Sequence, residues 1–179
     1  MTQTSTPTAT TGTATTGRHT AFETRLAAHA GIVRKVAASY AWNPHDRDDL
    51  MQDIVAALWQ AWPRYDPSRP FATWMYRVAL NVAISQVRGE TRRRRHHVAY
   101  DADVHDAEAP NGDLADDEQL VLLQRAMQSL DPLNRALLML HLDERSHREI
   151  ADVLGISESN VGTKLTRLKE RLRNTLASA

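Results

Sequence analysis

The chain has 179 residues, 42% of them hydrophobic, which is enough for one ordinary domain or two small ones with modest cores. It contains no cysteine, which excludes disulfides and thiolate metal sites. Its formal net charge is zero, but the charges are segregated along the chain.

Three segments differ in charge. Residues 1–95 contain 13 Lys or Arg and 7 Asp or Glu, whereas residues 96–124 contain 8 acidic residues and no Lys or Arg. Residues 125–179 are again slightly basic, with 9 Lys or Arg against 7 acidic residues. The acidic segment includes Pro110 and Gly112 and few large apolar residues, which predicts a flexible linker between two folded units.

The N-terminal segment, residues 1–20, contains ten threonines and no apolar run. It lacks the hydrophobic centre of a signal peptide, so we expect a disordered tail. The absence of cysteine and of an export signal favours a cytoplasmic protein. No membrane-spanning segment is expected.

Helical periodicity begins after the tail. Apolar residues recur at three- and four-residue steps over residues 21–40, which predicts one amphipathic helix. A second helix is expected from Asn43-Pro44, with Leu50, Ile54 and Leu58 on its apolar stripe. Its opposite face carries acidic and amide side chains, which form either a solvated surface or a binding surface.

A third helix is predicted over residues 71–97. Its expected packing side holds Phe71, Met75, Val78 and Val82, with Trp74 close by and with Tyr76 and Leu80 at the border. Its expected binding side holds Thr73, Arg77, Asn81 and Arg88.

The third helix ends in four consecutive arginines, residues 92–95. Adjacent guanidinium groups repel one another unless a polyanion is near, and aromatic side chains beside cations suit an unstacked nucleic acid. Two alternatives stay open: Trp74 and Tyr76 could be core residues beside solubilising arginines, or the arginine run could be a localisation signal.

The C-terminal part has the pattern of a helix-turn-helix. Asp131-Pro132 opens one helix, Ser146 and Glu149 predict a capping box, and Gly155 is placed to end that helix in the left-handed conformation. Outward-facing side chains suited to base edges and phosphates are Ser159, Asn160, Thr163, Lys164 and Arg167. Gly162 either permits a close approach to DNA or is a tolerated weakness of the helix.

Enzymatic patterns are weak. The eight histidines show no HExxH spacing, and the pair His96-His97 points in two directions from a helix, so we expect no metal site there. Asp48, Asp49 and Asp53 could be imagined as magnesium ligands of a nuclease, but no phosphate-cradling loop accompanies them. We therefore expect no catalytic residue and no cofactor.

Taken together, three stretches resemble the small, two-domain extracytoplasmic-function (ECF) group of bacterial RNA polymerase sigma factors. They are DRDDLMQDIVAALWQAW, FATWMYRVALNVAISQVRGETRRRR and EIADVLGISESNVGTKLTRLKERLR, with the acidic segment between the second and the third. The resemblance runs from Phe22 to Leu176 and follows the family's order of parts. One departure is Ser85, where the family usually has an aspartate.

The resemblance implies a function for each surface. The acidic helix would dock on the polymerase clamp through Asp48, Asp49, Gln52 and Asp53. The third helix would recognise and melt the minus-ten promoter element through Thr73, Trp74, Tyr76, Arg77, Asn81, Arg88, Arg92, Arg93, Arg94 and Arg95. The outward face from Ser159 to Arg167 would read the minus-thirty-five element.

The expected fold is all-α, with two small helical domains joined by a flexible acidic linker. The expected boundaries are a tail at 1–20, an N-terminal domain at 21–97, the linker at 98–117 and a helix-turn-helix domain at 118–179. The implied partners are core RNA polymerase, promoter DNA and an anti-sigma factor, with no small-molecule substrate. A helix-turn-helix regulator that binds DNA by itself is the alternative, but it leaves the two N-terminal helices without a joint purpose.

Overall fold

The computed structural model describes residues 11–97 and 125–177, and within these ranges every regular element is helical. This confirms the all-α prediction. The chain forms two compact units, Met1–Ala30 and Gly31–Ala179. The expected linker at 98–117 lies outside the described residues, so the predicted domain boundaries stay predictions.

The first two helices differ from the sequence prediction. One helix was expected over residues 21–40, but α1 (Thr11–Ala28) and α2 (Ala30–Tyr40) are separated by a turn at His29. Residues 11–20, expected to be part of a disordered tail, belong to α1. Extending an existing helix costs far less than nucleating one, which is why a threonine-rich stretch can continue the helix of residues 21–28.

The start of α3 (Pro44–Ala61) confirms the predicted cap. The side chain of Asn43 accepts a hydrogen bond from the backbone N–H of Asp46 at 2.7 Å, and Pro44 occupies the first turn. Leu50, Ile54 and Leu58 are buried as expected. A short 3-10 helix, η1 (Trp62–Arg64), follows.

The packing of α4 (Phe71–His97) corrects the predicted one. Phe71 and Met75 are buried, but the rest of the buried set is Tyr76, Ala79, Leu80 and Ala83, while Val78 and Val82 are only half-buried. The reason is that α4 contacts α3 and also contacts α6 and α7. With neighbours on more than one side, the helix buries a wider face than a single apolar stripe, and the predicted border residues Tyr76 and Leu80 lie inside it.

The C-terminal helices confirm the helix-turn-helix. Asp131 caps α6 (Pro132–Leu142) by accepting from the backbone N–H groups of Leu133 and Asn134. Ser146 and Glu149 form the predicted capping box of α7 (His147–Leu154), and Gly155 ends α7 with a φ of 68°. Val161, Leu165 and Leu168 of α8 (Glu158–Ala177) are buried.

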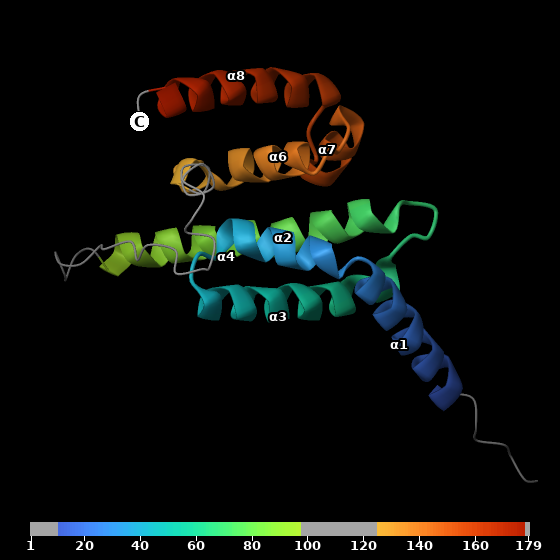
Figure 1. Ribbon diagram of the computed structural model, residues 1–179. Coiled ribbons are helices and arrows are strands. Elements are labelled where there is room, and N and C mark those ends of the chain that lie inside the picture. Colours follow the sequence, from blue (N-terminus) through green and yellow to red (C-terminus); the bar gives the residue numbers. More distant parts are fainter. Residues whose placement is uncertain (1–10, 98–124, 178–179) are drawn as a thin grey trace, which may run out of the picture. The chain divides into compact units, whose positions relative to one another are not determined.

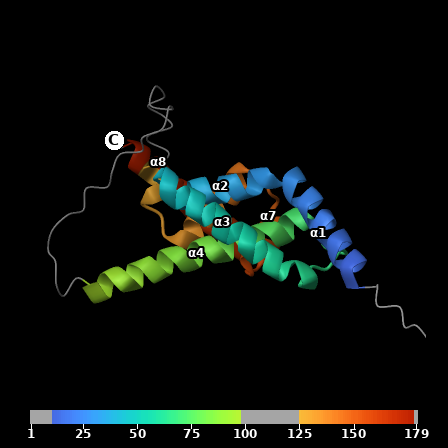
Figure 2. The same ribbon diagram turned by 90° about the horizontal axis from the view of Figure 1, so that it is seen from below.

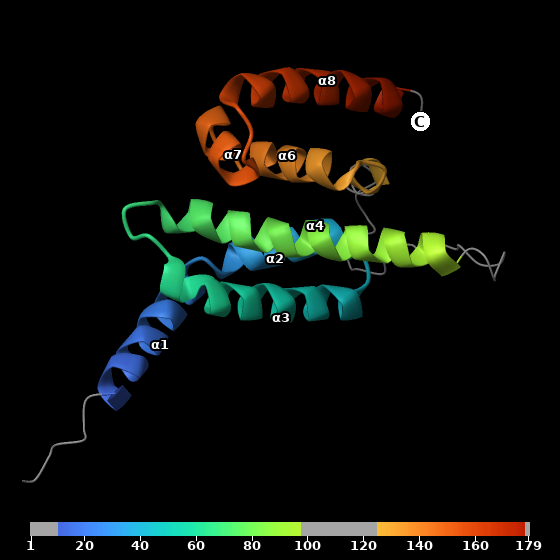
Figure 3. The same ribbon diagram turned by 180° about the vertical axis from the view of Figure 1, so that it is seen from behind.

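The helices of the second unit stack in layers, with α3 and α8 outermost (Figure 1). Figure 3, the opposite view, shows α4 between α3 and α6, and α6 and α7 between α4 and α8. The view from below shows α3 running obliquely across α2 and α4 (Figure 2). The outward surfaces of α3 and α8 therefore lie on opposite sides of this unit. Within the described ranges, no helix is long and apolar enough to span a membrane.

Candidate polymerase and nucleic-acid interfaces

The acidic face of α3 comprises Asp48, Asp49, Gln52 and Asp53, and all four side chains are exposed. Burial of Leu50, Ile54 and Leu58 against the core turns these four residues outward. Asp49 lies 3.2 Å from the imidazole of His45, an ion pair that exists only when His45 is protonated. The face is thus a largely anionic surface on an outer layer of the fold.

The binding side predicted for α4 is mostly exposed. Arg77, Asn81 and Arg88 are exposed, and Thr73 is half-buried. The four arginines at 92–95 belong to the helical span of α4, but their side chains lie outside the described residues. A cationic and amide face therefore runs along α4 at least from Arg77 to Arg88.

An aromatic cluster lies at the start of α4, and sequence reasoning identified only one of its members as functional. The rings of Trp62 and Tyr65 stack with centroids 5.3 Å apart, and Tyr65 lies 5.0 Å from Trp74. Phe71 contacts Trp74 at 5.3 Å. The signal in the sequence was the spacing of aromatic residues across the turn from Trp62 to Trp74. The cluster fixes the orientation of Trp74, which is half-buried.

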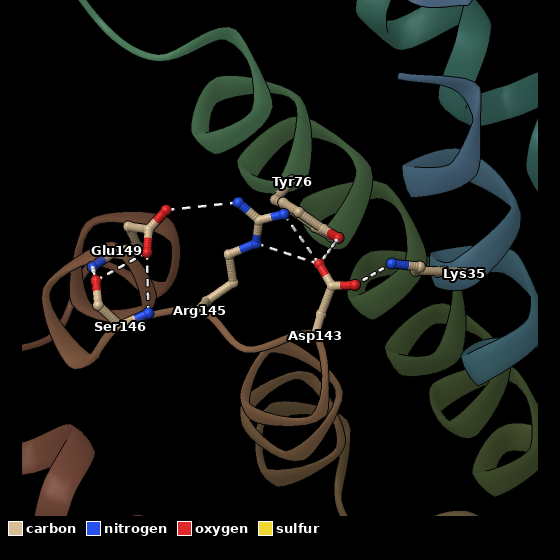
Figure 4. A network of polar contacts seen from close by, with 6 residues as sticks. All are labelled: Lys35, Tyr76, Asp143, Arg145, Ser146 and Glu149. Carbon is tan, nitrogen blue, oxygen red and sulfur yellow. Dashed lines mark hydrogen bonds and ion pairs between the residues drawn. The ribbon is translucent and has the colours of Figure 1, made fainter. Parts of the chain in front are cut away.

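Tyr76 lies in a different environment from the other predicted DNA-contacting residues. It is 1% exposed, and its hydroxyl donates a hydrogen bond of 2.5 Å to Asp143, in the turn after α6. Asp143 also accepts from Lys35 of α2 and from Arg145 (Figure 4). The guanidinium of Arg145 lies 5.4 Å from the centre of the Tyr76 ring. Tyr76 is therefore covered by protein in this structure.

Burial and hydrogen bonding together set the protonation states of Asp143 and Tyr76. Burial would raise the pKa of Asp143, but hydrogen bonds from Lys35, Tyr76 and Arg145 outweigh it and hold the pKa below its usual value. Burial, together with the hydrogen bond to Asp143, raises the pKa of Tyr76. The tyrosine is thus a neutral donor and the aspartate a charged acceptor at neutral pH.

A second polar group that the sequence did not reveal is Arg135 of α6, which is 6% exposed. Its guanidinium donates to the carbonyl oxygens of Met127 and Gln128, both at 3.0 Å, and of Leu130 at 3.2 Å. It also lies 5.2 Å from the ring centre of Tyr40 and 5.4 Å from that of Trp42. These contacts satisfy a buried charge.

The outward face of α8 agrees with the sequence prediction. Ser159, Asn160, Thr163 and Arg167 are exposed, and Lys164 is half-buried. Lys164 and Arg167 also line a shallow hollow of about 270 Å³, together with Asn134, Leu168 and Arg171. Three cationic side chains around one hollow suit phosphate oxygens.

Gly162 has room for a larger side chain. A Cβ at this position would meet only the His147 ring, at 3.8 Å, which is ordinary van der Waals contact. Packing inside the protein therefore does not require glycine here. Elsewhere in the described residues, no group of three or more His, Cys, Asp or Glu side chains is arranged to hold a metal ion.

Comparison with known proteins gives two family matches. The family described as Sigma-70 region 2 matches residues 26–93, and the family described as Sigma-70, region 4 matches residues 120–172. The first match contains the α3 and α4 surfaces, and the second contains the helix-turn-helix. The RNA polymerase sigma factor CarQ of Myxococcus xanthus is 31% identical over 164 residues, which cover 89% of this chain and 91% of CarQ.

Two further similarities extend the match. The ECF RNA polymerase sigma factor SigE of Mycolicibacterium smegmatis is 32% identical over 152 residues, covering 83% of this chain but only 59% of SigE. The solved structure of CnrH in complex with the cytosolic domain of CnrY matches with a TM-score of 0.65 and 25% identity. The alignment covers 93% of this chain and 94% of CnrH. CnrH is an RNA polymerase sigma factor of Cupriavidus metallidurans. The chain belongs to the ECF group of RNA polymerase sigma factors, proteins that direct transcription initiation at specific promoters.

Proposed function

We propose that this chain binds core RNA polymerase through the acidic face of α3 and opens promoters through α4. In the same proposal, α8 reads the minus-thirty-five element. The observation that supports it best is the placement of an anionic face and a DNA-suited face on the two outermost layers of one unit. A factor that must contact polymerase and DNA together needs such a separation.

The proposed work of α4 requires no covalent chemistry. Unstacking a base costs a few kcal/mol, which can be recovered when the base is captured against an aromatic side chain and its phosphates are held by arginine. Trp74 would supply the ring, and Arg77, Asn81 and Arg88 would hold the strand. The arginines at 92–95 would extend the phosphate contacts, and the chain would act without a catalytic residue or cofactor.

Two weak DNA-reading surfaces on one chain can bind tightly when both are engaged, because the second contact becomes intramolecular. An acidic linker at 98–117 between them is part of the proposal. So is a cytoplasmic location, where polymerase and promoter DNA are found. An anti-sigma factor is a further proposed partner, because the similar chain CnrH was solved in complex with another protein, the cytosolic domain of CnrY.

The proposal is tested by run-off transcription with core polymerase, in the presence and absence of this protein. We expect initiation at specific promoters only when both are present. DNA binding that needs no polymerase, with no stimulation of initiation, would instead favour the stand-alone regulator. Metal-dependent cleavage of DNA by the purified protein would favour the nuclease.

The polymerase contact is tested by Asp49→Arg combined with Asp53→Arg. Both side chains are exposed, so the fold should persist while reversed charge weakens co-purification with core polymerase by at least about tenfold. Asp66→Arg combined with Asp152→Arg, two exposed aspartates outside α3, makes the same change in net charge and is the matched control. Equal loss of polymerase binding in both double variants would show that binding depends on the net charge of the chain and not on the acidic face of α3.

A further inference from the structure

The hollow between α6 and α8 brings together four polar side chains, and two of them lie outside the surface assigned to base reading. Lys164 and Arg167 belong to the predicted minus-thirty-five set, but Asn134 and Arg171 do not. We propose that this hollow binds phosphate groups, of the DNA backbone or of a free polyphosphate, with Asn134 and Arg171 among the binding residues. The DNA-backbone source rests on the proposed function, whereas binding of a free polyphosphate does not.

The walls of the hollow come from two helices of opposite direction. The helices α6 and α8 contact each other and run side by side, so the start of α6 lies beside the middle of α8 (Figure 1 and Figure 3). The hollow measures about 270 Å³, close to the lower end of the range of about 300–1,000 Å³ for small-ligand sites. It therefore has room for a phosphate and for part of the group attached to it.

The cations of the hollow form one row along α8. Lys164, Arg167 and Arg171 follow one another at three- and four-residue steps, which places their side chains on one side of the helix. Like charges at this spacing repel one another and weaken a helix. None of the five residues that line the hollow is acidic. An anion bound between the cations would remove this repulsion.

The hollow also has an apolar wall. Leu168 is 4% exposed and belongs to the core of the helix-turn-helix, and it lines the hollow between the cations. A recess with charges of one sign and low-dielectric walls concentrates the electric field and raises the local concentration of counter-ions. The three cations should thus attract an anion more strongly here than on a flat surface.

On the α6 side, Asn134 is half-buried and held in a fixed position. Its backbone N–H and its side-chain amide both donate to Asp131, the residue that caps α6. The backbone N–H of Leu133 is bound to the same carboxylate, so a phosphate here has to be held by side chains. An asparagine amide has two N–H donors, and the contact with Asp131 uses one of them. The other donor serves an acceptor in the hollow.

These side chains suit phosphate in particular. The planar guanidinium of arginine donates two parallel hydrogen bonds to phosphate oxygens, and lysine adds a point charge. Ser159, Asn160 and Thr163 lie nearer the start of α8, so base edges and a phosphate can be contacted together. A free polyphosphate in the hollow would occupy Lys164 and Arg167, and it would therefore compete with DNA for α8.

The free-polyphosphate source is tested by titrating the free full-length chain with inorganic tripolyphosphate at fixed ionic strength. NMR signals of side-chain N–H groups report the binding, and we expect saturable shifts of the Asn134 amide. Arg171→Ala should weaken this binding by about tenfold, the loss expected for charge-assisted hydrogen bonds. Arg173→Ala removes the same charge from an exposed position of α8 outside the hollow, so it is the matched control and should bind like the original chain.

The DNA-backbone source is tested by ethylation interference on promoter DNA, with core polymerase bound to this chain. Ethylation removes the charge of one phosphate, so it weakens binding wherever the protein contacts that phosphate. Interference beside the minus-thirty-five element should be present with the original chain and with Arg173→Ala, and it should be lost with Arg171→Ala. The preference for intact over scrambled minus-thirty-five elements should stay unchanged in Arg171→Ala, because a phosphate contact carries no sequence information.

A second variant changes the opposite wall of the hollow. Asn134→Asp places a carboxylate there, and an acidic residue in the first turn suits the helix dipole, so α6 should persist. It should weaken whichever binding Arg171→Ala weakens. Binding like that of the original chain by both variants, in both experiments, would overturn the phosphate site. Equal losses in Arg171→Ala and Arg173→Ala would overturn it as well, since only net charge would then matter.

Failure of the proposed function has a different signature. If no form of the chain brings core polymerase to promoter DNA, the proposed function is overturned, and the tripolyphosphate titration alone decides the site. Binding that is weakened in Arg171→Ala and kept in Arg173→Ala would then support the phosphate site, and equal binding by both would overturn it.

Discussion

The sequence predicted one packing side and one exposed side for both α8 and α4, and only α8 follows the prediction closely. Val161, Leu165 and Leu168 of α8 are buried and the outward set is largely exposed. In α4 the predicted packing residues Val78 and Val82 are half-buried, while Tyr76 and Leu80 are in the core. A helix with neighbours on one side shows its packing in its sequence period, whereas a helix between two layers does not.

The largest effect is expected from core substitutions that compare the observed with the predicted packing of α4. Leu80→Ala should lower the free energy of unfolding by about 2–5 kcal/mol, because Leu80 is 2% exposed and a cavity would remain. Val82→Ala, at a half-buried position, should cost clearly less. Chemical denaturation measures the free energy of unfolding of both variants. A greater loss of stability for Val82→Ala would instead support the packing side predicted from the sequence.

A smaller effect should follow from changing the face of α4 that is proposed to open DNA. Trp74→Ala combined with Arg77→Ala should weaken promoter opening. The lost stacking should cost about 1–3 kcal/mol, and the lost phosphate contact should add to that cost. Permanganate reactivity of promoter thymines measures the opening, and co-purification measures polymerase binding. Arg77→Ala alone separates the phosphate contact from the aromatic cluster. Permanganate footprints of normal intensity in the double variant would contradict the assignment.

The corresponding test on α8 is Arg167→Ala. Loss of a contact to a base edge should reduce discrimination against altered minus-thirty-five elements by about 1–3 kcal/mol. Arg173→Ala removes the same charge from an exposed position of α8 outside the predicted reading set and is the control. Transcription from promoters with intact and scrambled upstream elements gives the ratio. If that ratio changes equally in both variants, the outward face does not read sequence.

The smallest effect is expected at Gly162, where the sequence left two alternatives. Alanine should stabilise the free protein by about 0.5–1 kcal/mol, since the position has space and alanine favours the helix. Thermal unfolding measures this gain. Reduced binding to minus-thirty-five DNA in the stabilised variant would indicate a close approach of the backbone to DNA, and unchanged binding would indicate a tolerated weakness.

Local signals in the sequence were sufficient for the capped helix ends and for the exposed faces, but not for the start of α1 or for the turn at His29. Asn43, Ser146 with Glu149, and Gly155 act on backbone groups within a few residues, so their roles follow from spacing alone. The family is recognisable for a similar reason, since its motifs are contiguous.

Contacts between distant segments could not be predicted in the same way. No local pattern pairs Tyr76 with Asp143 or brings Arg135 to Tyr40, because these partners are separated by 67 and about 95 residues and meet only when α6 packs across α2 and α4. The caps and outward faces of the helices thus come from local chemistry. The burial of Tyr76 and Leu80 comes from the packing of helices on both sides of α4, where the desolvation of each side chain depends on its neighbours in space.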